Sequence, residues 1–136
     1  MSAVGIRVAR ALPIDGALLG DVLLRFRRDA SATALRWTLG GRGTIEIAAS
    51  FTSQSSVWTT TARLWHRTGR TVTPAVVRAQ PHADDEVAVS LEAAGAVSPI
   101  WGENGRDLEV LANAALDELV EELLWYATRA GFTHGS

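Results

Sequence analysis

One short segment of the chain gathers several side chains that could do chemistry. Residues 56–70, SVWTTTARLWHRTGR, hold one histidine, two tryptophans, three consecutive threonines and three arginines. His66 is the candidate for proton transfer or for anchoring a polar group of a ligand, because imidazole titrates near neutral pH and can both donate and accept hydrogen bonds. The plainer alternative is a partly exposed histidine at the end of a strand.

Strand alternation divides this segment between two faces, because successive side chains of a β-strand point to opposite sides. The more apolar set is predicted to face inward and consists of Trp58, Thr60, Ala62, Leu64 and His66. The outward set consists of Val57, Thr59, Thr61, Arg63, Trp65 and Arg67. His66 should therefore lie at the rim of the interior, where it is our candidate catalytic residue.

Other common chemistries find little support. The chain has no cysteine and no lysine, which excludes thiolates, disulfides and Schiff bases, and it has no G-x-S-x-G nucleophile motif. The segment PHADDE (81–86) could bind a hard cation, but a polar turn between two strands has the same composition and is the preferred interpretation. We therefore predict neither a metal nor a cofactor.

Charge is distributed unevenly over the 136 residues, although the formal net charge is only −2. Residues 1–80 contain eleven arginines against four acids, and residues 81–136 contain two arginines against eleven acids. The two halves either face each other in one fold or present oppositely charged surfaces for partners or self-association. The charge distribution is therefore compatible with a homodimer.

The arginines also suggest nucleic-acid binding as a function. Arginines on one strand surface could bind phosphates while Trp65 stacks on a base. The residues concerned are Arg36, Arg63, Arg67, Arg70 and Arg78. The acidic C-terminal part would repel phosphates, so the sequence argues against this function.

The N-terminal elements are a strand and a helix. Alternating residues predict a strand over 6–12 that ends at Pro13. Asp15 stands at the N-cap position of an amphipathic helix over about 15–29. Five further strands are predicted at 34–39, 44–51, 57–67, 71–79 and 86–93. Pro74 marks the fourth of these as an edge strand or a bulge, because proline cannot donate to the sheet.

A long amphipathic helix is predicted over 107–129, about 33 Å in length at ~1.5 Å per residue. Its apolar stripe consists of Leu108, Leu111, Ala112, Ala115, Leu116, Leu119, Leu123 and Tyr126. The acidic residues Asp117, Glu118, Glu121 and Glu122 should form a solvated face. Trp125 lies one position off the stripe and could mark an interface. Trp101, in the loop before this helix, could cover a cavity mouth or pack beneath the loop.

These elements predict one α+β domain over residues 1–136. Its curved antiparallel sheet of about six strands wraps around the long C-terminal helix, with one short helix after the first strand. The space between sheet and helix is then either a packed core or a pocket. No apolar run is long enough for a membrane span, and arginines interrupt the N-terminal apolar stretch, so we expect a cytoplasmic protein. Arginine-rich composition without lysine suggests a bacterial gene rich in GC.

This order of elements resembles the START-like helix-grip superfamily (SRPBCC), which includes plant pathogenesis-related allergens and bacterial polyketide cyclase/dehydrase-type proteins. The segment GGRGTIEI (40–47) resembles the glycine-rich loop and following strand of the plant members, with Arg42 in place of their proline. The segment RALPID (10–15) resembles the bacterial members, in which a strand runs through a proline into the first helix.

The resemblance implies a hydrophobic cavity for lipids, polyketides or similar ligands. The residues that we expect to line it are Trp37, Ile47, Trp58, Thr60, Leu64, Trp101, Leu119 and Tyr126. The first hypothesis is thus binding of an apolar small molecule, with cyclase or dehydratase activity as an extension in which His66 transfers the proton. The alternative is a protein-interaction or homo-oligomerisation domain with a filled core, using the charge-split surfaces and Trp125.

Overall fold

A mixed α+β architecture is seen in the computed structural model, which describes residues 5–29, 34–93 and 97–129. The strands are β1 (Ile6–Leu12), β2 (Ala34–Thr38), β3 (Thr44–Ala48), β4 (Thr52–Gln54), β5 (Val57–Trp65), β6 (Val72–Ala83) and β7 (Glu86–Ala93). The α-helices are α1 (Leu19–Asp29) and α2 (Arg106–Arg129). Short 3-10 helices are η1 (Gly16–Leu18), η2 (Gly40–Arg42), η3 (Pro99–Trp101) and η4 (Glu103–Gly105).

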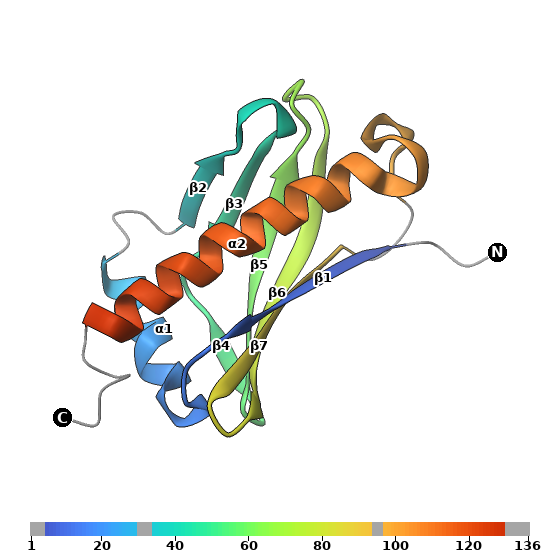
Figure 1. The fold of residues 1–136 in the computed structure, drawn as a ribbon. Coiled ribbons are helices and arrows are strands. Elements are labelled where there is room, and N and C mark those ends of the chain that lie inside the picture. The colour runs from blue at the N-terminus through green and yellow to red at the C-terminus, as the bar shows by residue number, and fades with distance from the viewer. Residues whose placement is uncertain (1–4, 30–33, 94–96, 130–136) are drawn as a thin grey trace.

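The strands form one antiparallel sheet in the order β1-β7-β6-β5-β3-β2, and β4 pairs with β5 beside β3. The long helix α2 runs diagonally across one face of this curved sheet (Figure 1). The predicted fold class, a curved antiparallel sheet gripping a long C-terminal helix with a short helix after the first strand, is confirmed.

The segment predicted as one strand over 44–51 is divided in two. The strand β3 ends at Ala48, and the three-residue β4 begins at Thr52 and pairs with the other end of β5. The Thr60 hydroxyl lies at this break, 2.9 Å from the carbonyl oxygen of Ala48 and 3.0 Å from that of Ser50, and donates to them. One buried side chain therefore holds the two pieces on β5.

The predicted N-terminal elements are confirmed. The strand β1 stops at Leu12, before Pro13, and the Asp15 carboxylate accepts a hydrogen bond from the Ala17 N–H at 2.9 Å. This cap opens η1, which continues directly into α1, so the predicted helix over 15–29 consists of one 3-10 turn and one α-helix.

The prediction that Pro74 marks an edge strand or a bulge was wrong. The strand β6 is central, since it pairs with β5 on one side and with β7 on the other. Pro74 is tolerated because it lies opposite Arg63 of β5, while the described ladder with β7 begins only at Val76. The irregular register in β6 occurs elsewhere, between Pro81 and Ala83.

The core lies between α2 and the sheet. Every residue of the predicted apolar stripe is buried except Tyr126, which is partly buried. Arg10 of β1 ties the helix to the sheet edge, because its Nε lies 2.7 Å from Asp117 Oδ1 and its Nη2 lies 2.8 Å from Asn113 Oδ1. Asp117 is exposed, as predicted for the acidic face, and it is also held by this ion pair.

Ion pairs join the basic and acidic halves of the chain. Besides Arg10 and Asp117, the Arg7 Nε lies 3.9 Å from Glu92 Oε2 across β1 and β7. The halves thus face each other at the β1 edge, which supports partial neutralisation within one fold. As far as the chain is described, none of its helices has the length and apolarity needed to cross a membrane.

Candidate functional site

His66 is the first residue after β5, and a tight turn fixes its backbone. The His66 N–H donates to the Thr71 carbonyl at 2.9 Å, and the Gly69 N–H donates to the His66 carbonyl at 2.7 Å. Gly69 has φ +75°, a left-handed conformation that glycine adopts without strain. The turn directs the imidazole toward the interior, where only 6% of His66 is exposed.

The two ring nitrogens of His66 have different surroundings. The Thr68 N–H donates to Nδ1 at 3.3 Å, and the Thr68 hydroxyl lies 3.1 Å from the same atom. Because Nδ1 accepts, the neutral imidazole carries its proton on Nε2. Among the described residues Nε2 has no hydrogen-bond partner. Every side-chain nitrogen or oxygen of these residues that is fully shielded from solvent does have such a partner. Nε2 therefore reaches solvent and can donate to a ligand.

Trp101 forms the floor beneath His66. Its ring stands edge-on to the imidazole with centroids 5.1 Å apart, and its Nε1 donates to Thr73 Oγ1 at 3.0 Å. The side chain is fully buried, so of the two predicted positions Trp101 takes the one beneath the loop. It is the last residue of η3 and lies next to His66 at this end of the interior.

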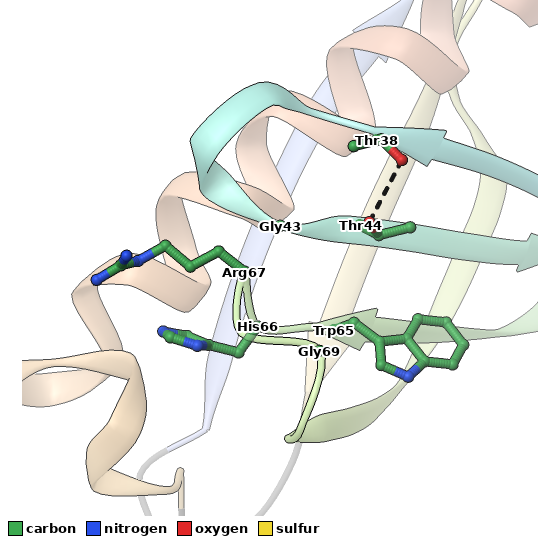
Figure 2. A pocket seen from close by; sticks show the side chains of 7 residues that line it. All are labelled: Thr38, Gly43, Thr44, Trp65, His66, Arg67 and Gly69. Atoms are coloured by element: carbon green, nitrogen blue, oxygen red, sulfur yellow. Dashed lines mark hydrogen bonds between the residues drawn. The ribbon is translucent and has the colours of Figure 1, made fainter.

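Two adjacent clefts share His66 and Arg67. The outer cleft has a volume of about 330 Å³ and is lined by Thr38, Gly43, Thr44, Trp65, His66, Arg67 and Gly69 (Figure 2). The second, the His66 cleft, has a volume of about 250 Å³ and is lined by Gly41, Arg42, His66, Arg67, Asp107 and Val110. In Figure 2 the side chains of His66 and Arg67 extend to one side and that of Trp65 to the other. His66 lines both clefts, and the His66 cleft lies between the β2–β3 turn and the start of α2.

Gly43 brings the glycine-rich turn against this site. It has φ +131°, and a Cβ placed on it would lie 2.3 Å from the Trp65 carbonyl oxygen and 3.1 Å from a Leu111 methyl group. No side chain fits there. The close approach lets the turn η2 carry Arg42 to the wall of the His66 cleft.

The charge of the His66 cleft is positive. Two arginines, Arg42 and Arg67, oppose the single carboxylate of Asp107, for a formal charge of +1 with neutral His66. All three charged side chains are exposed. Within the described part of the chain, neither guanidinium forms a hydrogen bond or an ion pair. The arrangement can therefore bind an acceptor group with charge-assisted hydrogen bonds.

The other predicted ligand-lining residues do not line the His66 cleft. Ile47, Leu64 and Leu119 are fully buried members of one hydrophobic cluster. Tyr126 packs edge-on against Phe26 at the far end of α2, with ring centroids 6.0 Å apart. These four residues line neither the outer cleft nor the His66 cleft.

Trp58 and Trp37 lie away from His66. Trp58, at the opposite end of β5, is partly buried against Gly20 and helps line a cleft of about 590 Å³. This Trp58 cleft is lined by Asp15, Gly16, Ala17, Gly20, Ser53, Ser56, Trp58, Pro81, Ala83 and Asp84. Trp37 is paired with Ile45 across β2 and β3, and its side chain is not among those that the structure describes.

Sequence reasoning did not single out Arg42 or Asp107 as site residues. It correctly expected Arg67 to be exposed but did not expect it to line a cleft with His66. One signal was present, since Arg42 stands where the resembled plant proteins have proline. Of the PHADDE segment only Asp84 and Asp85 form the predicted turn, because residues 81–83 belong to β6 and Glu86 begins β7. His82 Nε2 lies 4.0 Å from Glu86 Oε2. The described residues contain no group of three histidine or acidic side chains able to hold a metal ion.

Comparison with known proteins identifies the fold. No protein-family model matches the chain, and no curated protein matches its sequence. Human STARD10 superposes with a TM-score of 0.51 at 12% identity over 96% of this chain. DynU16, a protein of the dynemicin biosynthetic locus, superposes with a TM-score of 0.50 at 14% identity over 92% of this chain. The chain spans 66% of the first protein and 47% of the second. It has the START-like helix-grip fold.

Proposed function

We propose that this protein binds a small molecule with an apolar body and a polar head group, at the end of the helix-grip interior where His66 lies. The observation that carries the proposal is the environment of the His66 ring. Most buried polar atoms have a hydrogen-bond partner, whereas Nε2 of this imidazole has none among the described residues. The ring rests on Trp101, and His66 lines a cleft. The hydrophobic ligands implied by the resemblance to START-like proteins agree with such a site.

The apolar body of the ligand needs space that side chains now fill. Leu111, Trp101 and Leu64 are all fully buried at or near this end of the interior. The segment over Trp101 is irregular, with left-handed backbone at Gly102 (φ +87°), Asn104 (φ +56°) and Gly105 (φ +69°). Short turns of this kind rearrange more readily than core strands. Binding would therefore displace Trp101 and let the apolar body take its place.

The proposal concerns binding first. Cyclisation or dehydration of a polyketide-like substrate would also need a paired acid and base. His66 offers Nε2 as one partner, but no carboxylate in the described chain hydrogen-bonds to His66, and Asp107 is the only acid that lines its cleft. A catalytic role for His66 is thus an extension of the binding proposal, and it would be tested by loss of turnover in His66→Gln with retained ligand affinity.

Titration with the amphipathic dye 1-anilinonaphthalene-8-sulfonate, followed by its fluorescence, tests the binding proposal. Saturable binding of one dye per chain is expected, with weaker affinity in His66→Ala because the open donor is lost. The control Trp125→Ala removes a tryptophan that is 50% exposed on α2 and should not change the affinity. Absence of saturable binding, or equal affinity in His66→Ala, would contradict the proposal.

The filled interior and two exposed apolar side chains favour a second candidate, a protein-interaction or homodimer surface. Leu24 and Trp125 are each 50% exposed on the two helices. Native mass spectrometry of the wild type and of Trp125→Ser separates the two candidates. A wild-type dimer that becomes a monomer in the variant would support the interaction function, and a monomer in both would remove it.

A further inference from the structure

The His66 cleft has walls from three separate parts of the fold. Arg42 comes from the η2 turn between β2 and β3, Arg67 from the turn after β5, and Asp107 from the first turn of α2. Gly43 forces the first two parts together, because its Cα lies against the end of β5 with no room for a side chain. The fold thus brings both arginines to the wall of one cleft of about 250 Å³.

We propose that the His66 cleft binds a monoanionic carboxylate head group, held by Arg42 and Arg67 and by a hydrogen bond from His66 Nε2. This inference rests on the proposed function and adds the chemistry of the head group. A guanidinium presents donors in a planar fork that matches a carboxylate, and charge-assisted pairs of this kind are roughly twice as strong as neutral hydrogen bonds.

The state of His66 supports an acceptor-only ligand. Its Nδ1 is occupied by Thr68, so the ring can use only Nε2 toward the cleft. Nε2 carries a hydrogen in both the neutral tautomer fixed by Thr68 and the protonated form. A carboxylate, which accepts and does not donate, is satisfied by this atom in either state. A ligand hydroxyl would meet only donors from His66 and both arginines.

Asp107 lowers the positive charge of the cleft and so limits how much negative charge the ligand can carry. Its carboxylate bends back over η3 and η4, where Oδ2 would lie 3.3 Å from a Cβ placed on Gly102. Against two arginines it leaves a formal charge of +1, which one negative charge neutralises. A dianion such as a phosphate monoester would meet Asp107 with surplus negative charge, so the cleft favours a carboxylate over that group.

Two ligands with the same apolar body test the proposal. Decanoate and decan-1-ol share a ten-carbon chain and differ in the head group, and their affinities for the whole chain can be measured by isothermal titration calorimetry near neutral pH. Decanoate should bind about tenfold more tightly than decan-1-ol, as expected for charge-assisted contacts in a partly exposed cleft. Raising the ionic strength from roughly 0.01 M to 0.15 M should weaken decanoate alone, because the Debye length shortens from about 30 Å to about 8 Å.

Charge-neutral variants locate the site. Arg42→Gln and Arg67→Gln should each weaken decanoate binding roughly fivefold to tenfold and leave decan-1-ol unchanged. Asp107→Asn should do the opposite and tighten decanoate binding, because it removes a negative charge from the cleft wall. The matched control is Arg78→Gln, an exposed arginine of β6 that lines neither the His66 cleft nor the outer cleft, and it should change neither affinity.

The outcomes separate this inference from the function on which it rests. Equal affinities for the two decyl compounds, or a decanoate affinity that neither arginine variant lowers, would overturn the carboxylate site and leave the binding function standing. Failure of both compounds and of the naphthalene dye to bind would overturn the function and the head-group site together. Because all four substituted residues are exposed, the variants should fold, and their circular dichroism spectra would verify this.

Discussion

The His66 cleft and the Trp58 cleft lie at opposite ends of β5, and the larger one has the weaker claim to function. The Trp58 cleft has about 590 Å³ against about 250 Å³ for the His66 cleft. Its charged lining residues are Asp15 and Asp84, and the Asp15 carboxylate already caps η1. The His66 cleft is lined by two arginines without protein partners in the described chain and by His66, whose Nε2 has no hydrogen-bond partner there.

Glycines shape both ends but with different consequences. At the Trp58 end, Gly20 gives room for the Trp58 ring, and a Cβ on Gly16 would lie 2.7 Å from the Pro81 Cβ. These contacts press η1 and α1 against the sheet. At the His66 end, the close approach at Gly43 instead delivers a charged side chain to a cleft. Close packing at a glycine is thus common to both ends, whereas arginines without protein partners in the described chain distinguish the His66 end.

The largest expected effect concerns the tryptophan at each end. Trp101→Ala should destabilise the chain by roughly 3–5 kcal/mol, because it empties a fully buried space and removes the bond to Thr73. Trp58→Ala removes a partly buried ring and should cost about 1–3 kcal/mol. Urea unfolding measures both free energies. Equal losses of unfolding free energy would show that the two ends are packed alike, which would contradict the difference drawn between them.

A glycine pair tests the close approach at the His66 end. Gly43→Ala should lower the free energy of unfolding by about 2–4 kcal/mol, because it combines an unfavourable φ with a collision against backbone. Gly41→Ala, in the same turn, is the matched control, since a Cβ there meets nothing within 4 Å. Thermal unfolding of the two variants gives the difference, and an unchanged midpoint for Gly43→Ala would show that the turn can move away from β5.

The smallest expected effect lies in the hairpin at the Trp58 end. Ser55 and Ser56 join β4 to β5 with φ of +52° and +68°, a conformation that favours glycine. Ser56→Gly should raise the free energy of unfolding by roughly 0.5–1 kcal/mol, because it relieves left-handed strain. It should leave decanoate affinity unchanged although Ser56 lines the Trp58 cleft. A changed affinity would move the binding site to that end.

The sequence predicted what short-range periodicity determines. Alternation along β5 placed Thr60, Leu64 and His66 inward, and the stripe on α2 was right because both patterns depend only on local geometry. Beyond Trp65, where β5 ends, His66 is buried and Arg67 is exposed as the alternation predicted, but the two side chains do not point to opposite sides. Arg67 lies in the turn and extends to the same side as His66 (Figure 2).

Features that depend on packing between distant segments could not be predicted. Whether the interior is filled depends on how Trp101, Leu64 and Leu111 fit together, and these residues are far apart in sequence. The clustering of Arg42, Arg67 and Asp107 arises from three separate connections meeting at one end of the sheet. The placement of Pro74 within a central strand likewise depends on where β7 ends.

Mapping of decanoate binding by amide chemical shifts tests the central claim most directly. Saturating decanoate should shift the amides of 41–44, 66–69 and 107–111, around the His66 cleft, and leave those of 53–58 and 81–84, around the Trp58 cleft, in place. Shifts confined to the Trp58 end, or no shifts at saturating ligand, would contradict the claim that the His66 end of the helix grip is the binding site.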